Sequence, residues 1–199
     1  MDCAKTLFDL DAAITYRDGL IHAFLALIPL RRRNLADLVL ALTLVREGLS
    51  WIVNFGEEDR KTYAAFEMGL PDVLRVPLET YLETHRPLLM ARLGRWTRPA
   101  EGALWVSKDG SPMTQMALYD RIRARTKDHF GVAINPHAFR TAAATTLAIA
   151  DPAHVRAAAP LLGHRTFATT ERHYRQSRAV EAHRSYVDVL FKTDGGRHD

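Results

Sequence analysis

The hydrophobic positions at the start of the chain recur at helical spacing. From position 6 to about position 42 apolar residues return every three or four positions, which predicts helices. One apolar stripe consists of Leu20, Phe24, Leu27 and Ile28, and a second begins after Pro29 with Leu30, Leu35 and Leu38. The most apolar part, residues 19–30, is shorter than the roughly 20 residues that a membrane span needs. We therefore predict a buried helix here and no contact with a membrane.

The pattern changes between positions 44 and 70. Two runs rich in aromatic and β-branched residues, 49–55 and 62–68, flank the charged segment 56–61. Such runs on either side of a short polar segment are typical of a β-hairpin. We predict a hairpin with residues 56–61 as its turn.

Most of the remaining chain favours helices. A helical pattern covers residues 77–93, where Pro87 is expected to end or kink the helix, and residues 103–106 are a candidate short strand before a turn at 108–110. Further helices are predicted at 113–130, 136–149, 152–162 and 167–190. The predicted fold class is therefore mainly α with a small antiparallel β-sheet, an α+β arrangement.

Composition adds limits on the class of protein. The 199 residues include 27 Lys and Arg against 23 Asp and Glu, a formal net charge of +4, and 47% are hydrophobic. These values are typical of a globular protein and disfavour disorder, collagen and coiled coil. Cys3 is the only cysteine, which excludes an internal disulfide framework and a CxxC zinc site. We expect a cytoplasmic, reducing location.

One predicted helix begins with residues suited to an anion. Asn135 is a typical N-cap, Pro136 occupies the first helical position, and His137 and Arg140 follow three residues apart. Residues at this spacing share a helix face, and the first turn adds free N–H groups. This arrangement favours an anion, most simply a phosphate. The alternative is a solvated arginine beside a capping histidine.

The stretch 161–174 helps to decide between a phosphate-binding and a merely structural role for His137 and Arg140. Leu161, Leu162, Gly163 and His164 stand where a helix should end, and the next helix carries Thr169, Thr170 and Tyr174. With the HxxR pair at 137 and 140, these residues resemble, in order and spacing, the tyrosine recombinases of the phage-integrase family. The resemblance covers positions 23 to 174. It implies the tyrosine-recombinase catalytic-domain fold, that of a DNA breaking-rejoining enzyme.

The resemblance implies two more catalytic residues. The family's first arginine follows an apolar helix and a turn, which is the place of Arg31; the alternative is that residues 31–33 are only a basic surface cluster. The family's lysine lies in the hairpin turn, and Lys61 is the lysine of the predicted turn; the alternative is an exposed hairpin lysine. His164 and Tyr174 have structural alternatives as well, as a turn cap and as a half-buried helix residue.

Two positions depart from the family pattern. The acidic residue that often follows the first arginine by three is Asn34 here, so a supporting carboxylate is missing or supplied by Asp37. The commonest spacing puts the tyrosine at the position of His173, one residue before Tyr174. One residue turns a helix by about 100°, so the local turn must differ. We choose Tyr174 because histidine cannot form a phosphotyrosine linkage.

The resemblance implies strand cleavage by Tyr174 at a DNA phosphodiester. A tyrosine hydroxyl has a pKa of ~10, so the attack needs a base and nearby positive charge. Arg31 and Arg140 would hold the non-bridging oxygens bidentately. The product would be a 3′-phosphotyrosyl enzyme with a free 5′-hydroxyl, which allows rejoining without ATP.

The other implied residues handle protons and hydrogen bonds. His137 would help deprotonate the tyrosine or bond the phosphate, His164 would donate to the phosphate, and Lys61 would protonate the leaving 5′-oxygen. No cofactor and no metal are expected, since the histidines show neither HExxH nor paired metal-ligand spacing.

Further arginines are candidate contacts to double-stranded DNA, the expected partner. Guanidinium groups provide phosphate contacts that do not depend on sequence. Residues spaced by two cannot share one helix face, so only some of those at 121, 123 and 125 can meet DNA. The candidate DNA-binding set is Arg32, Arg33, Arg121, Arg123, Arg165 and Arg172.

We expect residues 1–175 to form the catalytic domain, without an N-terminal core-binding domain, and residues 176–199 to form a tail helix with a disordered end. The enzyme would be a site-specific recombinase of the integrase type, tetrameric on DNA and monomeric when isolated. Two alternatives remain: a catalytically weak relative that binds DNA or pairs with a full-length integrase, and a basic all-α phosphate-binding or regulatory protein.

Overall fold

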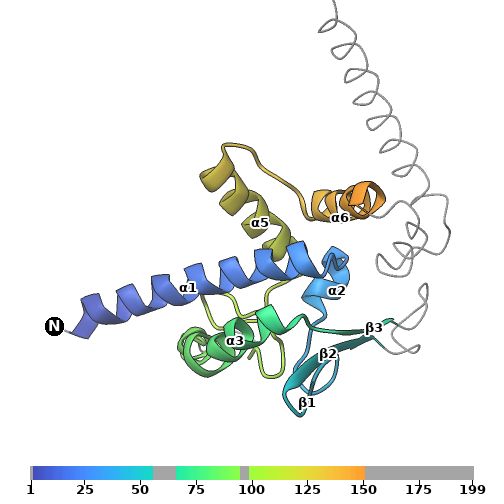
Figure 1. Ribbon diagram of the computed structural model, residues 1–199. Helices are drawn as coiled ribbons and strands as arrows, with labels where there is room; N and C mark the ends of the chain where they lie inside the picture. The colour runs from blue at the N-terminus through green and yellow to red at the C-terminus, as the bar shows by residue number, and fades with distance from the viewer. Residues whose placement is uncertain (1, 56–65, 95–98, 151–199) are drawn as a thin grey trace, which may run out of the picture. The chain divides into compact units, whose positions relative to one another are not determined.

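The computed structural model describes residues 2–55, 66–94 and 99–150 (Figure 1). The elements in chain order are α1 (Asp2–Leu27), α2 (Arg32–Ala36), β1 (Leu44–Glu47), β2 (Ser50–Phe55), β3 (Phe66–Gly69), α3 (Asp72–Thr80), the π-helix η1 (Tyr81–His85), α4 (Arg86–Met90), α5 (Gln115–Phe130) and α6 (Pro136–Ala150). By backbone packing the chain divides into two units, residues 1–140 and 141–199, and the first contains every element up to the first turn of α6. This content confirms the predicted fold class, mainly helical with a small antiparallel sheet.

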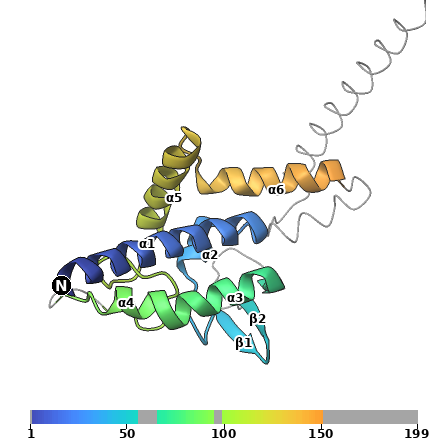
Figure 2. The same ribbon diagram turned by 60° about the vertical axis from the view of Figure 1, so that its left-hand side comes forward.

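Helix α1 is the central element of the first unit. It contacts α5 on one side and the run α3–η1–α4 on the other, and both views show α1 between them (Figures 1 and 2). Its predicted apolar stripe is buried at Leu20 and Phe24. Leu27 differs, because it is the last residue of the helix and its side chain is 45% exposed. The prediction of a buried helix is confirmed.

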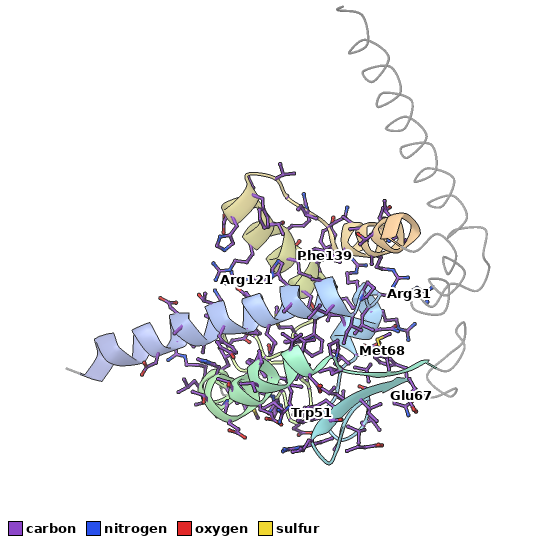
Figure 3. All side chains as sticks on the ribbon, viewed as in Figure 1. Arg31, Trp51, Glu67, Met68, Arg121 and Phe139 are labelled. Carbon is purple, nitrogen blue, oxygen red and sulfur yellow. The ribbon has the colours of Figure 1, made fainter. Side chains whose placement is uncertain are left out.

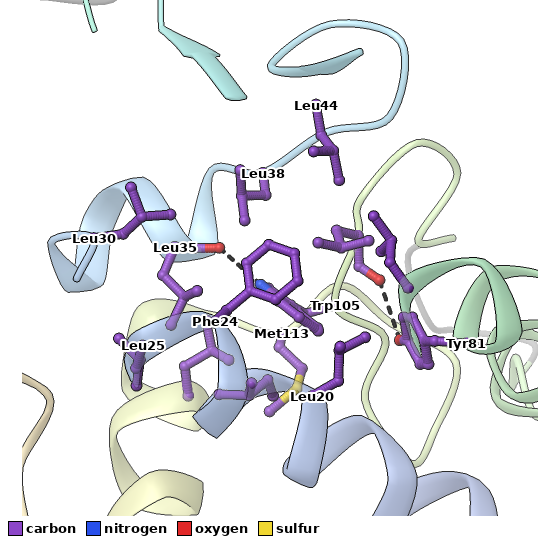
Figure 4. Packing of buried hydrophobic residues seen from close by; sticks show 14 of the residues in the cluster. Leu20, Phe24, Leu25, Leu30, Leu35, Leu38, Leu44, Tyr81, Trp105 and Met113 are labelled. Carbon is purple, nitrogen blue, oxygen red and sulfur yellow. Dashed lines mark hydrogen bonds between the residues drawn. The ribbon is translucent and has the colours of Figure 1, made fainter. Parts of the chain in front are cut away.

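The hydrophobic core gathers around Trp105, which is 1% exposed (Figure 4). Its indole Nε1 donates to the backbone carbonyl of Leu35 over 2.9 Å. The ring of Phe24 meets it edge-on with centroids 5.4 Å apart, and the ring of Tyr81 lies 5.9 Å away. The second predicted stripe, Leu30, Leu35 and Leu38, is buried in the same core. Trp105 therefore connects α1, α2 and η1.

The chain leaves the helical conformation after α2, earlier than the predicted limit at position 42. Ala41 has φ of 60°, a left-handed conformation that cannot continue a helix. The hydroxyl of Thr43 accepts from the N–H of Val39 at 2.7 Å and donates to the carbonyl of Asp37 at 2.9 Å. A side-chain hydroxyl thus replaces the helical bonds and turns the chain toward β1.

The three strands form an antiparallel sheet in the order β1-β2-β3. Strands β2 and β3 pair with Val53 opposite Met68, which confirms the predicted hairpin, although β3 begins only at residue 66. Strand β1, which pairs Leu44 with Val53, was not predicted because its last three residues are mostly polar. The hairpin turn at residues 56–65, including Lys61, lies outside the described residues.

Two prolines, Pro77 and Pro87, lie inside the helical run from α3 to α4. The run begins at Asp72, five residues before the predicted start at position 77. Pro87 was expected to end or kink the helix. Pro87 does not end the helix: the N–H of Arg86 bonds to the carbonyl of Tyr81, five residues back, and the run continues to Met90. Proline has no N–H to donate, and a π-turn just before it accommodates the missing bond.

Residues 103–106 do not form the predicted strand. Their backbone makes isolated bridges, Val39 with Ala103 and Val106 with Pro112. Buried side chains take the place of a neighbouring strand: Arg86 donates to the carbonyls of Ala103 and Glu101, and the hydroxyl of Tyr81 donates to the carbonyl of Leu104 at 3.1 Å. Burial of Tyr81 raises the pKa of its phenol to about 12, so the hydroxyl keeps its proton.

Candidate phosphate-binding site

The start of α6 is fixed by hydrogen bonds to side chains. The Oδ1 of Asn135 accepts from the N–H of Ala138 at 3.1 Å, which confirms the predicted N-cap. The preceding loop is tied to α5, because the hydroxyl of Thr126 accepts from the N–H of Ile134 at 2.8 Å. Helix α5 itself ends at Phe130 and is capped by Gly131, whose φ of 72° suits glycine. The position of the first turn of α6 is therefore set by α5.

Arg140, the second residue of the HxxR pair, points from α6 toward the end of α1. Arg140 is 7% exposed, and its Nη1 donates to the carbonyl of Pro29 over 2.5 Å. Pro29 stands two residues before Arg31, the N-cap of α2. Two arginines that are far apart in the sequence are thus brought to the same turn between α1 and α2.

The backbone of Arg31 is held by the core. It is extended, with φ of −65° and ψ of 147°, and its carbonyl accepts from the N–H of Leu35 at 2.9 Å. Leu35 is fully buried, and its own carbonyl accepts from Trp105. Packing of two apolar residues therefore fixes the point from which the half-exposed Arg31 side chain leaves the backbone (Figure 3).

An aromatic contact between α1 and α6 supports the same arrangement. The rings of His22 and Phe139 meet edge-on with centroids 6.2 Å apart. The Nδ1 of His22 is 2.6 Å from the carbonyl of Asp18, one turn earlier in α1. Phe139 directly precedes Arg140, so this contact holds the first turn of α6 against α1. His137, on that turn, is exposed.

This arrangement has the chemistry of an anion site. The guanidinium of Arg140 reaches the turn that leads to Arg31, and an exposed histidine stands on the same helical turn as Arg140. The N-terminus of α6 adds backbone N–H groups. Guanidinium donors match the oxygens of a phosphate in pairs. The carboxylate of Asp37, one of the two alternatives considered for the acidic residue absent at Asn34, pairs with Arg33 at 3.4 Å on the surface.

Arg121, a candidate DNA contact, reaches from α5 to a buried carboxylate on α1 (Figure 3). Its Nε is 2.6 Å from the Oδ2 of Asp18, which also accepts from Arg125 at 2.8 Å. The other oxygen, Oδ1, pairs with Arg17 at 2.7 Å. Asp18 is only 2% exposed, while the side chains of Arg121 and Arg125 are 34% and 24% exposed, so three guanidinium groups join α1 to α5 around one buried carboxylate. No local pattern in the sequence indicates this pairing.

Arg123 lies on a different face of α5. Its Cζ is 5.3 Å from the centroid of the Tyr119 ring, and the Cζ of Arg32, from α2, is 5.4 Å from the same centroid. Two candidate DNA contacts are thus brought together over one ring. The prediction that residues 121, 123 and 125 cannot share one face is confirmed. Tyr119 was missed, although its spacing of four from Arg123 places both on one helix face.

Five predicted residues lie outside the part of the chain that the structure describes: Lys61, His164, Arg165, Arg172 and Tyr174. Their roles stay predictions. Within residues 2–55, 66–94 and 99–150, no group of three His, Cys, Asp or Glu side chains is placed to hold a metal ion. Every helix in those ranges is too short or too polar to cross a membrane.

The surface of the first unit also carries a hollow of about 470 Å³, lined in part by Thr15, whose hydroxyl accepts from Arg125 at 3.3 Å. There the rings of Tyr16 and His85 stack with centroids 4.2 Å apart. Burial lowers the pKa of His85, which favours the neutral ring. The remaining lining residues, Asp11, Ala12 and Thr15, are exposed, and nothing in this hollow matches the predicted chemistry.

Comparison with known families gives one match. The model of the phage integrase family matches residues 2–181, nearly the whole chain. None of the curated proteins is significantly similar to the chain in sequence.

Solved structures with the same fold are site-specific recombinases. A XerH recombinase bound to a palindromic difH substrate after cleavage superposes with a TM-score of 0.67 at 18% identity, covering 93% of this chain and 51% of that one. A pre-cleavage XerH complex with difH gives 0.62 at 20% identity, covering 90% and 49%. The XerA recombinase gives 0.62 at 20% identity, covering 87% and 59%. The chain therefore spans about half of the length of these recombinases.

Proposed function

This chain belongs to the phage integrase family, and from that premise we propose that it cuts and rejoins double-stranded DNA as the catalytic domain of a site-specific recombinase. The observation that carries the proposal is the hydrogen bond from buried Arg140 to the carbonyl of Pro29. It brings the second arginine of the family's signature to the turn that leads into the first, Arg31. Support also comes from neighbours in fold whose described structures hold a DNA substrate before and after cleavage.

In the proposed reaction Arg31 and Arg140 bind the non-bridging oxygens of the scissile phosphate. Their positive charge offsets the negative charge that builds up as a fifth oxygen approaches phosphorus. The guanidinium of Arg140 and the backbone of Arg31 are held in place before DNA binds, which reduces the reorganisation needed during the reaction. This placement is the largest contribution that the described residues make to catalysis.

The bond changes follow from a tyrosine nucleophile. The phenolic oxygen of Tyr174 attacks phosphorus, the bond to the 5′-oxygen breaks, and Lys61 delivers a proton to that oxygen. His137 and His164 bond the phosphate oxygens or take the phenolic proton. The 5′-hydroxyl of another strand then attacks the 3′-phosphotyrosyl link and releases the tyrosine. We propose that a tetramer on DNA performs this exchange.

The test uses a nicked duplex that traps the covalent intermediate. Cleavage close to the nick frees a short oligonucleotide, which diffuses away and prevents rejoining. Because the target sequence is unknown, the duplexes form a pool with a randomised central region and a labelled strand. The proposal predicts a labelled band that survives SDS, is lost in Tyr174→Phe, and disappears after protease treatment. The proposal would be contradicted if the wild-type chain bound the nicked duplexes and formed no covalent band.

A catalytically weak DNA-binding relative is the second candidate. The observations that favour it are the position of Tyr174, one residue beyond the commonest family spacing, and Asn34 in place of an acidic residue. It predicts that the wild-type chain retains duplexes from the pool but forms no covalent band. A cleavage assay with an added full-length integrase would then show whether the chain changes the yield of that enzyme.

A further inference from the structure

Three side chains from α2 and α5 form a compact cationic group beside the candidate site. The guanidinium of Arg32 and that of Arg123 both lie over the ring of Tyr119, with Cζ-to-centroid distances of 5.4 and 5.3 Å. Both arginines are exposed, and Tyr119 is half-buried. These distances fall within the range of a cation–π interaction. One aromatic ring at the surface therefore contacts two exposed guanidinium groups.

Like charges repel, so two guanidinium groups that contact one ring favour the binding of an anion. Within residues 2–55, 66–94 and 99–150 no carboxylate pairs with Arg32 or Arg123. Elsewhere on the surface the same contact is neutralised: Arg46 lies 5.9 Å from the ring centroid of Trp51, and its Nη2 is 3.3 Å from the Oε1 of Glu79. The Tyr119 group thus lacks the acidic partner that its counterpart has.

We propose that Arg32, Tyr119 and Arg123 form a clamp for a DNA backbone phosphate next to the one that is cut, with Tyr119 as the positioning residue. This inference rests on the proposed function. Two planar forks of N–H donors suit the oxygens of a phosphate diester. The ring restricts both side chains before DNA arrives, which reduces the conformational entropy that binding costs.

The position of the clamp favours a nucleic acid over a free anion. Arg32 directly follows Arg31, so the clamp adjoins the site proposed for the scissile phosphate. A duplex presents a phosphate charge about every 1.7 Å along its axis. A duplex that places one phosphate at Arg31 and Arg140 therefore brings other phosphates to the neighbouring surface.

The experiment measures binding of a labelled duplex by the full 199-residue chain at a series of salt concentrations. Tyr119→Leu removes the ring, Tyr119→Phe keeps it, and Arg46→Ala is the matched control, because it removes an arginine of the same kind that a carboxylate already neutralises. Arg123→Ala is measured alone and in the Tyr119→Leu background. Circular dichroism and urea unfolding of each variant check that the fold is retained.

The clamp predicts a weaker affinity in Tyr119→Leu, by about three- to tenfold. It predicts that the slope of log K against log salt falls by about one in Arg123→Ala. Tyr119→Phe and Arg46→Ala should bind as wild type does, and Arg123→Ala should cost less affinity in the Tyr119→Leu background. Wild-type affinity and slope in a folded Tyr119→Leu variant would overturn the clamp alone. A wild-type chain that binds no duplex would overturn both the clamp and the proposed function.

Discussion

Arginines on two faces of α5 have opposite surroundings. On one face Arg121 and Arg125 donate to Asp18, a carboxylate that is 2% exposed and that also pairs with Arg17. On the other face Arg123 lies over the Tyr119 ring beside Arg32, with solvent around both guanidinium groups. These arginines all count equally toward the positive charge of the chain. Within the described ranges, however, only Arg32 and Arg123 among them face outward without a carboxylate partner.

The partner of an arginine therefore decides its role. A buried carboxylate surrounded by guanidinium groups fixes the position of one helix on another, and removal of one member leaves uncompensated charge. A guanidinium that an aromatic ring holds at the surface keeps its donors for a phosphate. The net charge of +4 thus says little about how much of the surface can bind DNA.

We expect the greatest change in stability when the buried cluster is altered. Asp18→Asn keeps the shape of the side chain and removes the negative charge, which leaves three guanidinium groups close together. The free energy of unfolding should fall by ~3–5 kcal/mol, as for one broken member of a buried ion pair. Urea denaturation followed by circular dichroism measures it. Asp120→Asn, an exposed carboxylate on α5, is the control, with an expected change within about 0.5 kcal/mol.

If Asp18→Asn lost less than about 1 kcal/mol, the cluster would not be what joins α1 to α5, and the contrast between the two faces would fail.

The second prediction concerns Arg140. Arg140→Ala removes a preorganised positive charge, and we expect the rate of covalent adduct formation to fall by about 10²–10³-fold. It also leaves the carbonyl of Pro29 without this donor, which costs ~1–3 kcal/mol of stability. Arg140→Lys keeps the charge without the two-pronged geometry and should be intermediate. Single-turnover assays at saturating enzyme measure the rate, and equal rates for Arg140→Ala and wild type would contradict the role.

The two faces of α5 can be compared directly with Arg121→Ala and Arg123→Ala. Arg123→Ala should bind duplex DNA roughly tenfold more weakly, as expected for one charge-assisted hydrogen bond of ~1.5 kcal/mol, and should unfold like wild type. Arg121→Ala should instead lower the free energy of unfolding and leave the slope of log K for DNA against log salt unchanged, because the guanidinium of Arg121 faces Asp18. An equal loss of salt slope in both variants would show that the two faces do not differ.

The mildest change should come from the surface pair of Arg33 and Asp37. Their side chains are 64% and 52% exposed, and the pair is separated by one helical turn. Such pairs contribute ~0.2–1 kcal/mol because water and salt screen them. Arg33→Ala should therefore lower the free energy of unfolding by less than about 1 kcal/mol. A loss as large as that of Asp18→Asn would mean that exposure does not separate the two kinds of arginine.

Much of the fold could be predicted because local patterns carry it. Helical periodicity and caps locate α1, α5 and the start of α6, and two runs of β-forming residues locate the hairpin. Strand β1 was missed because its four residues, two apolar followed by two charged, give no alternation. The continuation of the helix past Pro87 could not be predicted, because a π-turn, which no sequence pattern indicates, accommodates the proline.

In the candidate site, too, sequence could predict what local patterns indicate but not what tertiary packing brings together. Arg140 and Arg31 could be found from spacing and from a family's motifs. The pairing of Arg121 with Asp18 could not, because 103 positions separate them and only the packing of α5 on α1 brings them together. Sequence therefore identified which residues are basic, and tertiary structure determined which of them pair with a buried carboxylate and which lie over an aromatic ring.

The proposed chemistry requires that Arg31 and Arg140 neutralise the charge of the scissile phosphate. A duplex with a methylphosphonate at the cut position examines this requirement by itself, because a methyl group replaces one charged oxygen. Arg31→Ala and Arg140→Ala should cleave this neutral substrate much faster than they cleave the normal phosphodiester, relative to wild type. Variants that are folded but equally inactive on both substrates would contradict the proposal.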